Sequence, residues 1–598
     1  MDDQKNFALA MALSILLLVG YYIFFAGPMM EEAEAQRIAE EQKAAAAIET
    51  PVTVEPIPEI ESVRVPIRTP DIEGSLQLRG FTFDDAKLLD YEATLDDPSP
   101  VALLTAEDAA GAYAASIRDN WTTADGGSGA NADWQLVSGT ELTPESPITL
   151  RYEGQGFTVD RVVRSADRFL FAVEDTVTNT SGAEINLVRR GLSRQVGLPD
   201  GLINFMLLQE GPIAVVDGRL TDMKYGKIED EGREFATGEA GWAGLTDKYW
   251  LSAVAAPSET QMTAEFSYQV LNGRPVYDSG YVTSPLTLTP GASVTSTGHI
   301  FAGAKERALL ERLEDEYAIP ELNRAIDWGT LRILVKPMTT VLNWLGNAIG
   351  NFGVAIIVLT LLIKIVLFPL FNKQYRSMAG MKKVAPELKR IRERYSDGGG
   401  QITPENRMKV QQEMMALYKK EGVNPLSGCL PIIPTIFVFF ALYKTVLIDT
   451  ELRHAPFFGY IQDLSARESV NILNLFGALP YEVNPLTIGI LGFLALGPLA
   501  LLYGVTMAMM QTLQTPGGDP MQRKIFMALP WVFMFILAPF AAGLLVYWVA
   551  NNILSFLQSY IIYKRMGVPI PLEEWVATKL GRRKALPEGV DVLPPEKK

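Results

Sequence analysis

The spacing of apolar residues changes three times along the 598-residue chain, and each change predicts a different kind of structure. Near the start, positions 7–26 read FALAMALSILLLVGYYIFFA, an unbroken run of apolar or small residues. As a helix this run is ~30 Å long, which matches the hydrocarbon thickness of a bilayer. A cleaved signal peptide is the alternative, but the acidic start MDDQKN and the end FAGPMM do not fit one. We predict a transmembrane anchor at residues 1–27 and a linker at 28–61, which is rich in Ala, Glu and Pro.

Apolar and polar residues alternate in the next segment, residues 62–320. The stretch ITLRYEGQGFTVDRVVRSADRFLFAVEDTVTNTSG keeps this period of two and closes on turn residues. A turn signal, NGRP, separates two further strand-like runs. A long series of such strands predicts a large antiparallel β-sandwich. The end of this segment, 303–320, has the pattern of a helix.

From residue 321 the chain has the pattern of membrane helices. Within 321–350, apolar residues recur every three or four positions, namely Trp328, Leu331, Val335, Met338, Leu342 and Leu345. This spacing predicts an amphipathic helix on the membrane surface, with a buried helix of the sandwich as the alternative. Five apolar segments follow, at about 351–371, 425–447, 485–511, 525–540 and 541–562. The predicted fold class is a multi-domain membrane protein, in which a five-span α-helical core joins an anchor helix and a β-sandwich. Its second transmembrane span is 351–371, and four further spans lie within 425–562.

The charge pattern predicts a topology for these spans. Residues 1–320 carry 24 basic and 50 acidic residues, whereas 321–598 carry 29 and 19. The loop 372–424 holds 12 Lys and Arg, but 448–484 holds only 2. Because Lys- and Arg-rich loops stay in the cytoplasm, 372–424 and the basic tail 563–598 are predicted to be cytoplasmic, as are both termini. The acidic sandwich is then outside, which is the periplasm if this multi-pass protein lies in the inner membrane of a bacterium with two membranes.

The basic loop 372–424 has a shape of its own. Two amphipathic stretches flank the turn SDGGGQITP, in which Thr403 is a candidate helix N-cap, so the loop is predicted to be a helical hairpin. It is either a solvated connector held by anionic lipids or a landing site for a ribosome or a nascent chain. Its methionines favour the second interpretation, because they offer an adaptable apolar surface. The basic tail is a second candidate contact for the ribosome.

Composition argues against several chemistries. The single cysteine, Cys429, excludes an internal disulfide. Only two histidines, His299 and His454, are available for metal binding or acid–base catalysis. The sequence contains no G-x-x-x-x-G-K-[ST] motif, which argues against ATP hydrolysis. We therefore expect no enzyme activity, no cofactor, no metal and no direct nucleic-acid function.

One charged residue, Lys364, lies inside an apolar span, in the stretch VLTLLIKIVLFPLF. A lysine at the centre of a bilayer costs ~2.5–3.5 kcal/mol. The side chain can extend to the cytoplasmic headgroups, or it can face a wet cavity within the helices. Thr360 lies one turn earlier on the same helix face, and the last span contains Tyr547, Trp548, Asn551 and Asn552. So many polar groups at depth favour a hydrophilic groove that is open to the cytoplasm and to lipid.

Several long stretches resemble the YidC family of bacterial membrane protein insertases, which also includes mitochondrial and chloroplast oxidase-assembly-type insertases. They are QEMMALYKKEGVNPLSGCLPIIPTIFVFFALYKTVL, ELRHAPFFGYIQDLSA, DPMQRKIFMALP and GLLVYWVANNILSFLQSYIIYKR. The resemblance covers essentially the whole chain and implies the Gram-negative form, with its periplasmic sandwich. In this family that sandwich resembles sugar mutarotases, but the only histidine of the domain is His299, so no sugar chemistry is expected.

The resemblance also implies roles for individual residues. Lys364 stands where the family has a basic groove residue, which is arginine in many members. Thr360, Tyr547 and Trp548 fall at groove positions that touch substrate, although a tyrosine is common where Trp548 stands. Asn551 completes the predicted substrate-binding groove. The implied function is insertion and folding of nascent inner-membrane proteins, alone or with the Sec translocon as partner. The alternative is a small-solute transporter or channel, but we find no internal repeat in the sequence to support it.

Overall fold

The computed structural model describes residues 63–106, 113–126, 129, 131–199, 208–231, 233–396, 404–423, 432–479, 495–514, 520–568, 570 and 573. The chain divides into a β-rich unit and a helical unit. The predicted anchor, the linker, Cys429, Thr403 and nearly all of the basic tail lie outside the described residues.

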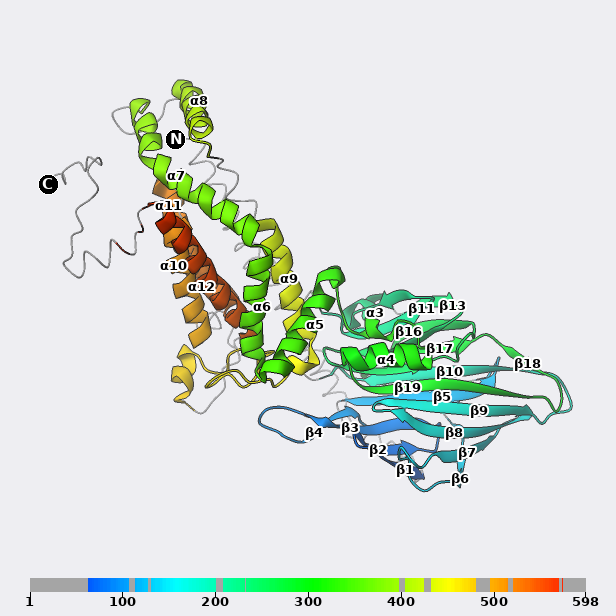
Figure 1. Cartoon of the computed structure of the whole chain (residues 1–598). Helices are drawn as coiled ribbons and strands as arrows, with labels where there is room; N and C mark the ends of the chain where they lie inside the picture. Colours follow the sequence, from blue (N-terminus) through cyan, green and yellow to red (C-terminus); the bar gives the residue numbers. More distant parts are fainter. Residues whose placement is uncertain are drawn as a thin grey trace. The chain divides into compact units, whose positions relative to one another are not determined.

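The β-rich unit contains two antiparallel sheets, as predicted (Figure 1). In spatial order the ten-stranded sheet comprises β1 (Arg64–Arg68), β2 (Ile72–Gln77), β3 (Thr82–Glu92), β5 (Ala114–Thr123), β10 (Ile185–Val196), β17 (Arg274–Thr283), β16 (Met262–Leu271) and β13 (Arg233–Gly238), with β4 (Pro100–Leu104) beside β3 and β18 (Leu286–Leu288) beside β10. The nine-stranded sheet comprises β12 (Arg219–Asp222), β11 (Gly211–Val216), β14 (Gly241–Thr246), β15 (Trp250–Ala255), β19 (Ser293–Ala304), β9 (Leu170–Asn179), β8 (Phe157–Asp167), β7 (Ile148–Glu153) and β6 (Trp134–Ser138).

The period-two pattern explains the core of this unit. Along β8 and β9 every second side chain is buried, so the strands present one apolar face to the space between the sheets. Aromatic rings meet there, and the ring centroids of Phe83 and Phe171 lie 5.3 Å apart. Two helices, α3 (Tyr225–Glu231) and α4 (Arg307–Tyr317), belong to the same unit. Helix α4 is shorter than the helix predicted at 303–320, because β19 continues to Ala304 and Ala318 ends the helix in the left-handed region.

The predicted amphipathic helix is α5 (Arg332–Ile349), almost all of which belongs to the helical unit. Trp328 and Leu331 were expected on this helix but both precede it. Gly329, which lies between them, adopts a positive φ of 62°, a backbone conformation that a right-handed helix does not contain. Along α5 the predicted apolar face is buried at Val335, Leu342 and Leu345. The opposite face is also apolar but exposed, and it includes Ile333 and Trp344.

A sharp bend follows α5. Helix α6 (Phe352–Val366) and helix α7 (Phe368–Arg394) meet at Leu367 with an angle of 72° between them. Pro369 lies in the first turn of α7, where its missing N–H is tolerated, but it cannot continue the hydrogen-bond ladder of α6. The span predicted as 351–371 therefore changes direction at Leu367, four residues before its expected end.

The remaining helices are α8 (Pro404–Lys420), α9 (Ile432–Ile448), α10 (Pro498–Gln514), α11 (Pro520–Leu537) and α12 (Ala542–Arg565). Helix α12 packs against α6, α7 and α10 (Figure 1). Among the described residues, only α12 is long and apolar enough to cross a membrane as one straight helix, and the bent pair α6–α7 meets the criterion together. Three shorter apolar helices accompany them, Pro434–Ile448, Pro498–Leu513 and Phe526–Leu537. The count of five core spans stays a prediction.

Candidate functional site

The ammonium group of Lys364 points into the helical unit. It lies in the last turn of α6, with a side chain that is 9% exposed. Its Nζ donates a hydrogen bond of 2.6 Å to the hydroxyl of Ser555 on α12, and it lies 4.3 Å from the ring centroid of Phe371 on α7. Ser555 in turn donates to the carbonyl of Asn551. Among the described residues no carboxylate pairs with this ammonium, so a buried cation is held by a hydroxyl and an aromatic ring.

A small cavity adjoins the Lys364 side chain. Its volume is about 10 Å³, and its walls are formed by Thr360, Ile363, Lys364, Leu367, Phe371, Thr435, Val438, Tyr547 and Asn551. That volume is roughly enough for one water molecule. Four of the five predicted groove residues line it, from α6 and α12. A cavity of this volume has no room for a polypeptide.

Trp548, the fifth predicted groove residue, does not line this cavity. Its indole stacks on Phe439 of α9 with centroids 5.2 Å apart, and it also contacts Tyr503 and Phe540, each at 5.8 Å. Consecutive helical residues point about 100° apart, so Tyr547 and Trp548 cannot share one face of α12. Trp548 instead joins an aromatic cluster between α9, α10 and α12.

Sequence reasoning missed three residues that complete the site. Ser555 could have been found, because it follows Asn551 by four residues and therefore lies on the same face of α12. Phe371 reaches Lys364 only because the chain bends at Leu367. Thr435 belongs to α9, and no pattern in the sequence indicates which residues of two separate helices meet.

The ends of the helices around the site are fixed by polar contacts. At the C-terminus of α10, Lys382 donates to the carbonyl of Thr512 at 3.1 Å, and Tyr563 donates to the carbonyl of Leu513 at 2.7 Å. These bonds satisfy carbonyl groups that a helix end leaves unpaired. At the other end of α10, the Glu468 carboxylate accepts hydrogen bonds from the N–H groups of Leu499 and Ala500. A negative charge at this position complements the helix dipole.

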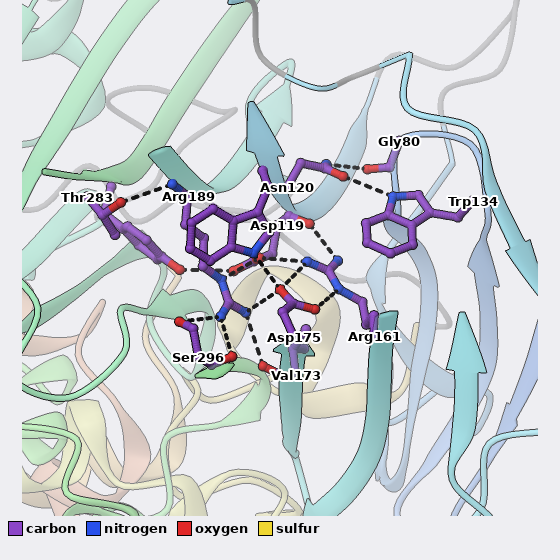
Figure 2. A network of polar contacts seen from close by, with 12 residues as sticks. Gly80, Asp119, Asn120, Trp134, Arg161, Val173, Asp175, Arg189, Thr283 and Ser296 are labelled. Carbon is purple, nitrogen blue, oxygen red and sulfur yellow. Dashed lines mark hydrogen bonds and ion pairs between the residues drawn. The ribbon is translucent and has the colours of Figure 1, made fainter. Parts of the chain in front are cut away.

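The sandwich contains a second group of charges, buried between its sheets (Figure 2). Arg161 of β8 donates to Asp175 of β9 at 2.7 and 2.8 Å and to Asp119 of β5 at 3.2 Å. Arg189 of β10 donates to Asp119 at 2.8 Å, and its guanidinium lies 3.5 Å from Asp175. All four side chains are at most 1% exposed. This four-residue network, which joins both sheets, was not predicted from the sequence.

Neighbouring groups complete the hydrogen bonding of the network. Trp121 donates to Asp175 at 2.8 Å, and Tyr281 donates to Asp119 at 2.9 Å. Arg161 also lies over the ring of Phe81, 4.0 Å from its centroid. Burial by itself raises the pKa of Asp175, but the guanidinium groups of Arg161 and Arg189 outweigh burial and hold that pKa below its ordinary value. Asp175 therefore stays charged at neutral pH, and the network links the two sheets.

His299 has a structural environment as well. Its ring contacts Tyr317 edge-on, with centroids 5.5 Å apart. Burial and the nearby charge of Arg189 lower the pKa of His299 to about 4, so the imidazole is neutral at pH 7. In the part of the chain that the structure describes, no group of three His, Cys, Asp or Glu side chains could hold a metal ion.

Two family models match the chain. The model of the YidC periplasmic domain matches residues 64–341, and that of the 60Kd inner membrane protein matches residues 344–568. The membrane protein insertase YidC of Maricaulis maris is 42% identical, over 97% of this chain and 99% of that protein. The insertase of the same name from Rhizobium meliloti is 39% identical, over 96% and 97%. A solved active YidC insertase with its first transmembrane domain resolved is 15% identical, over 83% of this chain and 92% of that chain, with a TM-score of 0.34.

Proposed function

This chain belongs to the YidC family of membrane protein insertases, and we propose on that premise that the Lys364 cavity is the closed form of its substrate groove. The protein inserts membrane proteins into the inner membrane, and it carries a periplasmic domain. The groove residues are Lys364, Thr360, Tyr547 and Asn551, with Ser555 as an addition. Trp548 acts beside the groove, through its contacts with α9 and α10.

The observation that carries this proposal is a buried ammonium group without a carboxylate partner among the described residues. Ser555 and Phe371 stabilise the cation weakly, and a carboxylate of an entering substrate replaces them with a stronger, charge-assisted contact. The low dielectric inside the helices strengthens that attraction. The substrate therefore places its polar, often acidic, segment beside Lys364 and releases its apolar span to lipid.

Opening of the groove requires movement, because the cavity has room for roughly one water. We assign this movement to the bend at Leu367, because α6 and α7 make few contacts with each other. Helix α7 is the longer of the two helices. Partitioning of the apolar span into lipid supplies the driving force, so insertion needs no nucleotide and involves no catalysed covalent reaction.

The hairpin of α7 and α8 is the proposed contact for ribosomes and nascent chains, together with the basic tail. Val384 and Leu388 of α7 pack on Leu417 of α8, which holds the two helices together. Met408 and Met415 remain on the outside, 70% and 58% exposed, among basic residues. This surface suits a nascent apolar segment and anionic lipid headgroups. The Sec translocon is proposed as a further partner, and the multi-pass topology with cytoplasmic termini is proposed from the distribution of Lys and Arg.

Reconstitution of the purified chain in liposomes tests the proposal. We expect protease-protected insertion of a single-span substrate without ATP. Lys364→Glu should slow a substrate with an acidic translocated segment by about 10-fold more than a substrate with a neutral one, since about 1.4 kcal/mol corresponds to 10-fold. Lys87→Glu is the matched control, because Lys87 is an exposed lysine of β3 in the sandwich. Equal slowing of both substrates would refute charge capture, and solute flux without insertion would favour the transporter.

A further inference from the structure

The described part of the segment between α9 and α10 places polar side chains inside and apolar side chains outside. Asn471 and Asn474 are 2% and 4% exposed. Four apolar residues of the same segment are 36% to 60% exposed, and this apolar tip comprises Ile472, Leu475, Phe476 and Leu479. A segment that faces water normally has the reverse arrangement, because burial of apolar surface is favourable. The tip therefore suits an apolar environment rather than water.

Asn474 gives the apolar tip a fixed shape. Its side-chain oxygen accepts hydrogen bonds of 2.8 and 3.1 Å from the backbone N–H groups of Asn471 and Gly477. Leu475 and Phe476, which these bonds enclose, both have a positive φ, 52° and 56°, a conformation that residues with a side chain rarely adopt. Such a conformation persists only where the surrounding structure imposes it, and it concentrates at binding sites. The tip is therefore preformed, with its two largest apolar side chains held outward.

Hydrogen bonds tie this segment to the starts of two apolar helices. The carbonyl of Ala466 accepts a bond of 2.7 Å from the N–H of Ala542, the first residue of α12. The Glu468 carboxylate accepts bonds from two N–H groups in the first turn of α10. The backbone N–H of Ile472 donates to the carbonyl of Leu496 at 3.0 Å, two residues before α10 begins. Because apolar membrane helices end near the lipid headgroups, the apolar tip lies close to that level.

Arg467 supplies a positive charge at the same level. It lies between Ala466 and Glu468, is partly buried, and has no hydrogen bond or ion pair with another of the described residues. Glu468 does not neutralise it, because that carboxylate binds Tyr460 and the start of α10. Burial lowers the pKa of Arg467, and no acidic group among the described residues offsets this effect. A guanidinium with unfilled donors suits a phosphate, which accepts two parallel hydrogen bonds.

We propose that Arg467 and the apolar tip together bind phospholipid, with the tip among the acyl chains of one leaflet and Arg467 on a lipid phosphate. The apolar side chains gain free energy by leaving water, and the guanidinium remains at the headgroups. Leu502 and Val505 of α10 are also exposed, so apolar surface continues along the helix that the tip adjoins. The leaflet is the periplasmic one on the proposed topology, but the lipid contact does not depend on that assignment.

Lipid is the occupant that accounts for both parts of this element. A second copy of the chain or an apolar polypeptide would also cover the apolar tip, but neither explains a guanidinium without a partner at the depth of the headgroups. The lipid contact holds the starts of α10 and α12 at a fixed depth in the bilayer. Tyr547 and Asn551 of the proposed groove lie within the first three turns of α12, so their depth is fixed as well. This role is separate from charge capture by Lys364.

Electron paramagnetic resonance of a spin label measures the depth of the tip, with the full chain in vesicles of equal parts phosphatidylcholine and phosphatidylglycerol. The label is attached at Ile472→Cys, after Cys429→Ser has removed the only native cysteine. Oxygen concentrates among acyl chains and a nickel chelate stays in water, so access to these two reagents reports depth. We expect the label at residue 472 to be accessible to oxygen and protected from the chelate. A label at Lys87→Cys, an exposed position of β3, should show the reverse.

Two further variants test the two parts of the element. The double variant Leu475→Asp and Phe476→Asp should expose the label to the chelate, because charged side chains are costly in hydrocarbon. Arg467→Gln should enlarge the water-exposed population of the tip by about 5-fold, which is the contribution of one basic group near an anionic surface. Arg164→Gln is the matched control, since Arg164 pairs with Glu174 on the surface of the sandwich, and it should leave the depth unchanged.

Three results would overturn the proposal. The first is greater access of the chelate than of oxygen at residue 472. The second is protection from both reagents, which would mean that protein covers the tip: a second copy if dilution with lipid removes the protection, and another segment of this chain if it does not. The third is an unchanged depth in Arg467→Gln. If that variant does not fold, vesicles of digalactosyldiacylglycerol, which has no phosphate, test the same contact with Arg467 in place, and an unchanged depth there would overturn it. The Lys364→Glu insertion test has no bearing on these depths, so the two proposals fail separately.

Discussion

Replacing Asp175 with asparagine removes one charge from the buried network of the sandwich and keeps the shape of the side chain. The carboxylate accepts bonds of 2.7 and 2.8 Å from Arg161 and one of 2.8 Å from Trp121. An asparagine amide has one acceptor oxygen, and its nitrogen carries hydrogens that would face the guanidinium hydrogens of Arg161. Arg161 and Arg189 would then share a single carboxylate, that of Asp119.

The size of the effect follows from burial. Removing one partner of a buried ion pair costs about 3–5 kcal/mol, because an uncompensated charge remains out of water. The same change at the exposed pair of Arg151 and Asp160 costs about 0–1 kcal/mol. In the Arg161–Asp175 and Arg151–Asp160 pairs the shortest distance between nitrogen and oxygen is the same, 2.7 Å, and each pair includes a residue of β8. The two pairs therefore differ mainly in exposure. Asp175→Asn should therefore destabilise the sandwich by several times more than Asp160→Asn.

Hydrogen–deuterium exchange of the full chain measures this difference, because it reports the opening free energy of individual strands. We expect β5, β8, β9 and β10 to lose about 3–5 kcal/mol of protection in Asp175→Asn, while the helical unit exchanges as before. Asp160→Asn should change these strands little. Equal loss of protection in the two variants would refute the argument, since it would mean that burial of the network adds nothing to the cost.

Two further predictions concern pH and packing. The pKa of His299 falls from 6.5 to about 4 on folding, so below pH 6.5 the unfolded chain binds a proton that the folded chain excludes. Stability should therefore fall as the pH drops from 6.5 to 4, by up to about 3.4 kcal/mol, and urea denaturation of His299→Gln should show a smaller fall with pH. In α6, a Cβ on Gly353 would lie 2.0 Å from the ring of Phe457, so Gly353→Ala should destabilise the helical unit by about 1–3 kcal/mol. Gly380→Ala, whose nearest neighbour is Val423 at 3.3 Å, should cost less in thermal unfolding; equal costs would contradict the packing argument.

The sandwich could be predicted because its strands bury one face, and burial of one face imposes a period of two. The same period of two also indicates that the charged residues of the network point inward. Arg161 is in phase with Phe157, Val159 and Val163, which are all buried residues of β8. Asp175 is likewise in phase with Val173 and Val177 of β9. A charged residue at an inward position indicates a buried partner, but the partner's identity depends on contacts across the sheets that no local pattern contains.

The predicted groove residues show that sequence patterns have the same limit in the helical unit. A spacing of four residues places Thr360 on the same helix face as Lys364, and Tyr547 on the same face as Asn551. All four residues line one cavity. Spacing alone would also have separated Trp548 from Tyr547, because adjacent residues point in different directions. The bend at Leu367 is a different matter. Pro369 predicts a break in the helix, but the position of Phe371 beside Lys364 depends on the direction of the bend.

That bend explains how a lysine is tolerated so deep in the apolar segment. If the helix continued to residue 371, Lys364 would lie in its interior, with every nearby carbonyl already bonded. Because α6 ends at Val366, the ammonium lies in the last turn, where the helix dipole contributes about 0.3–1 kcal/mol. A cation–π contact with Phe371 adds about 0.5–2 kcal/mol, and Ser555 satisfies one donor. Each of these contacts is weak and replaceable, whereas a carboxylate partner within the protein would compete directly with the substrate. On our proposal, the protein can therefore fold with this charge buried, and the charge remains available to an acidic substrate.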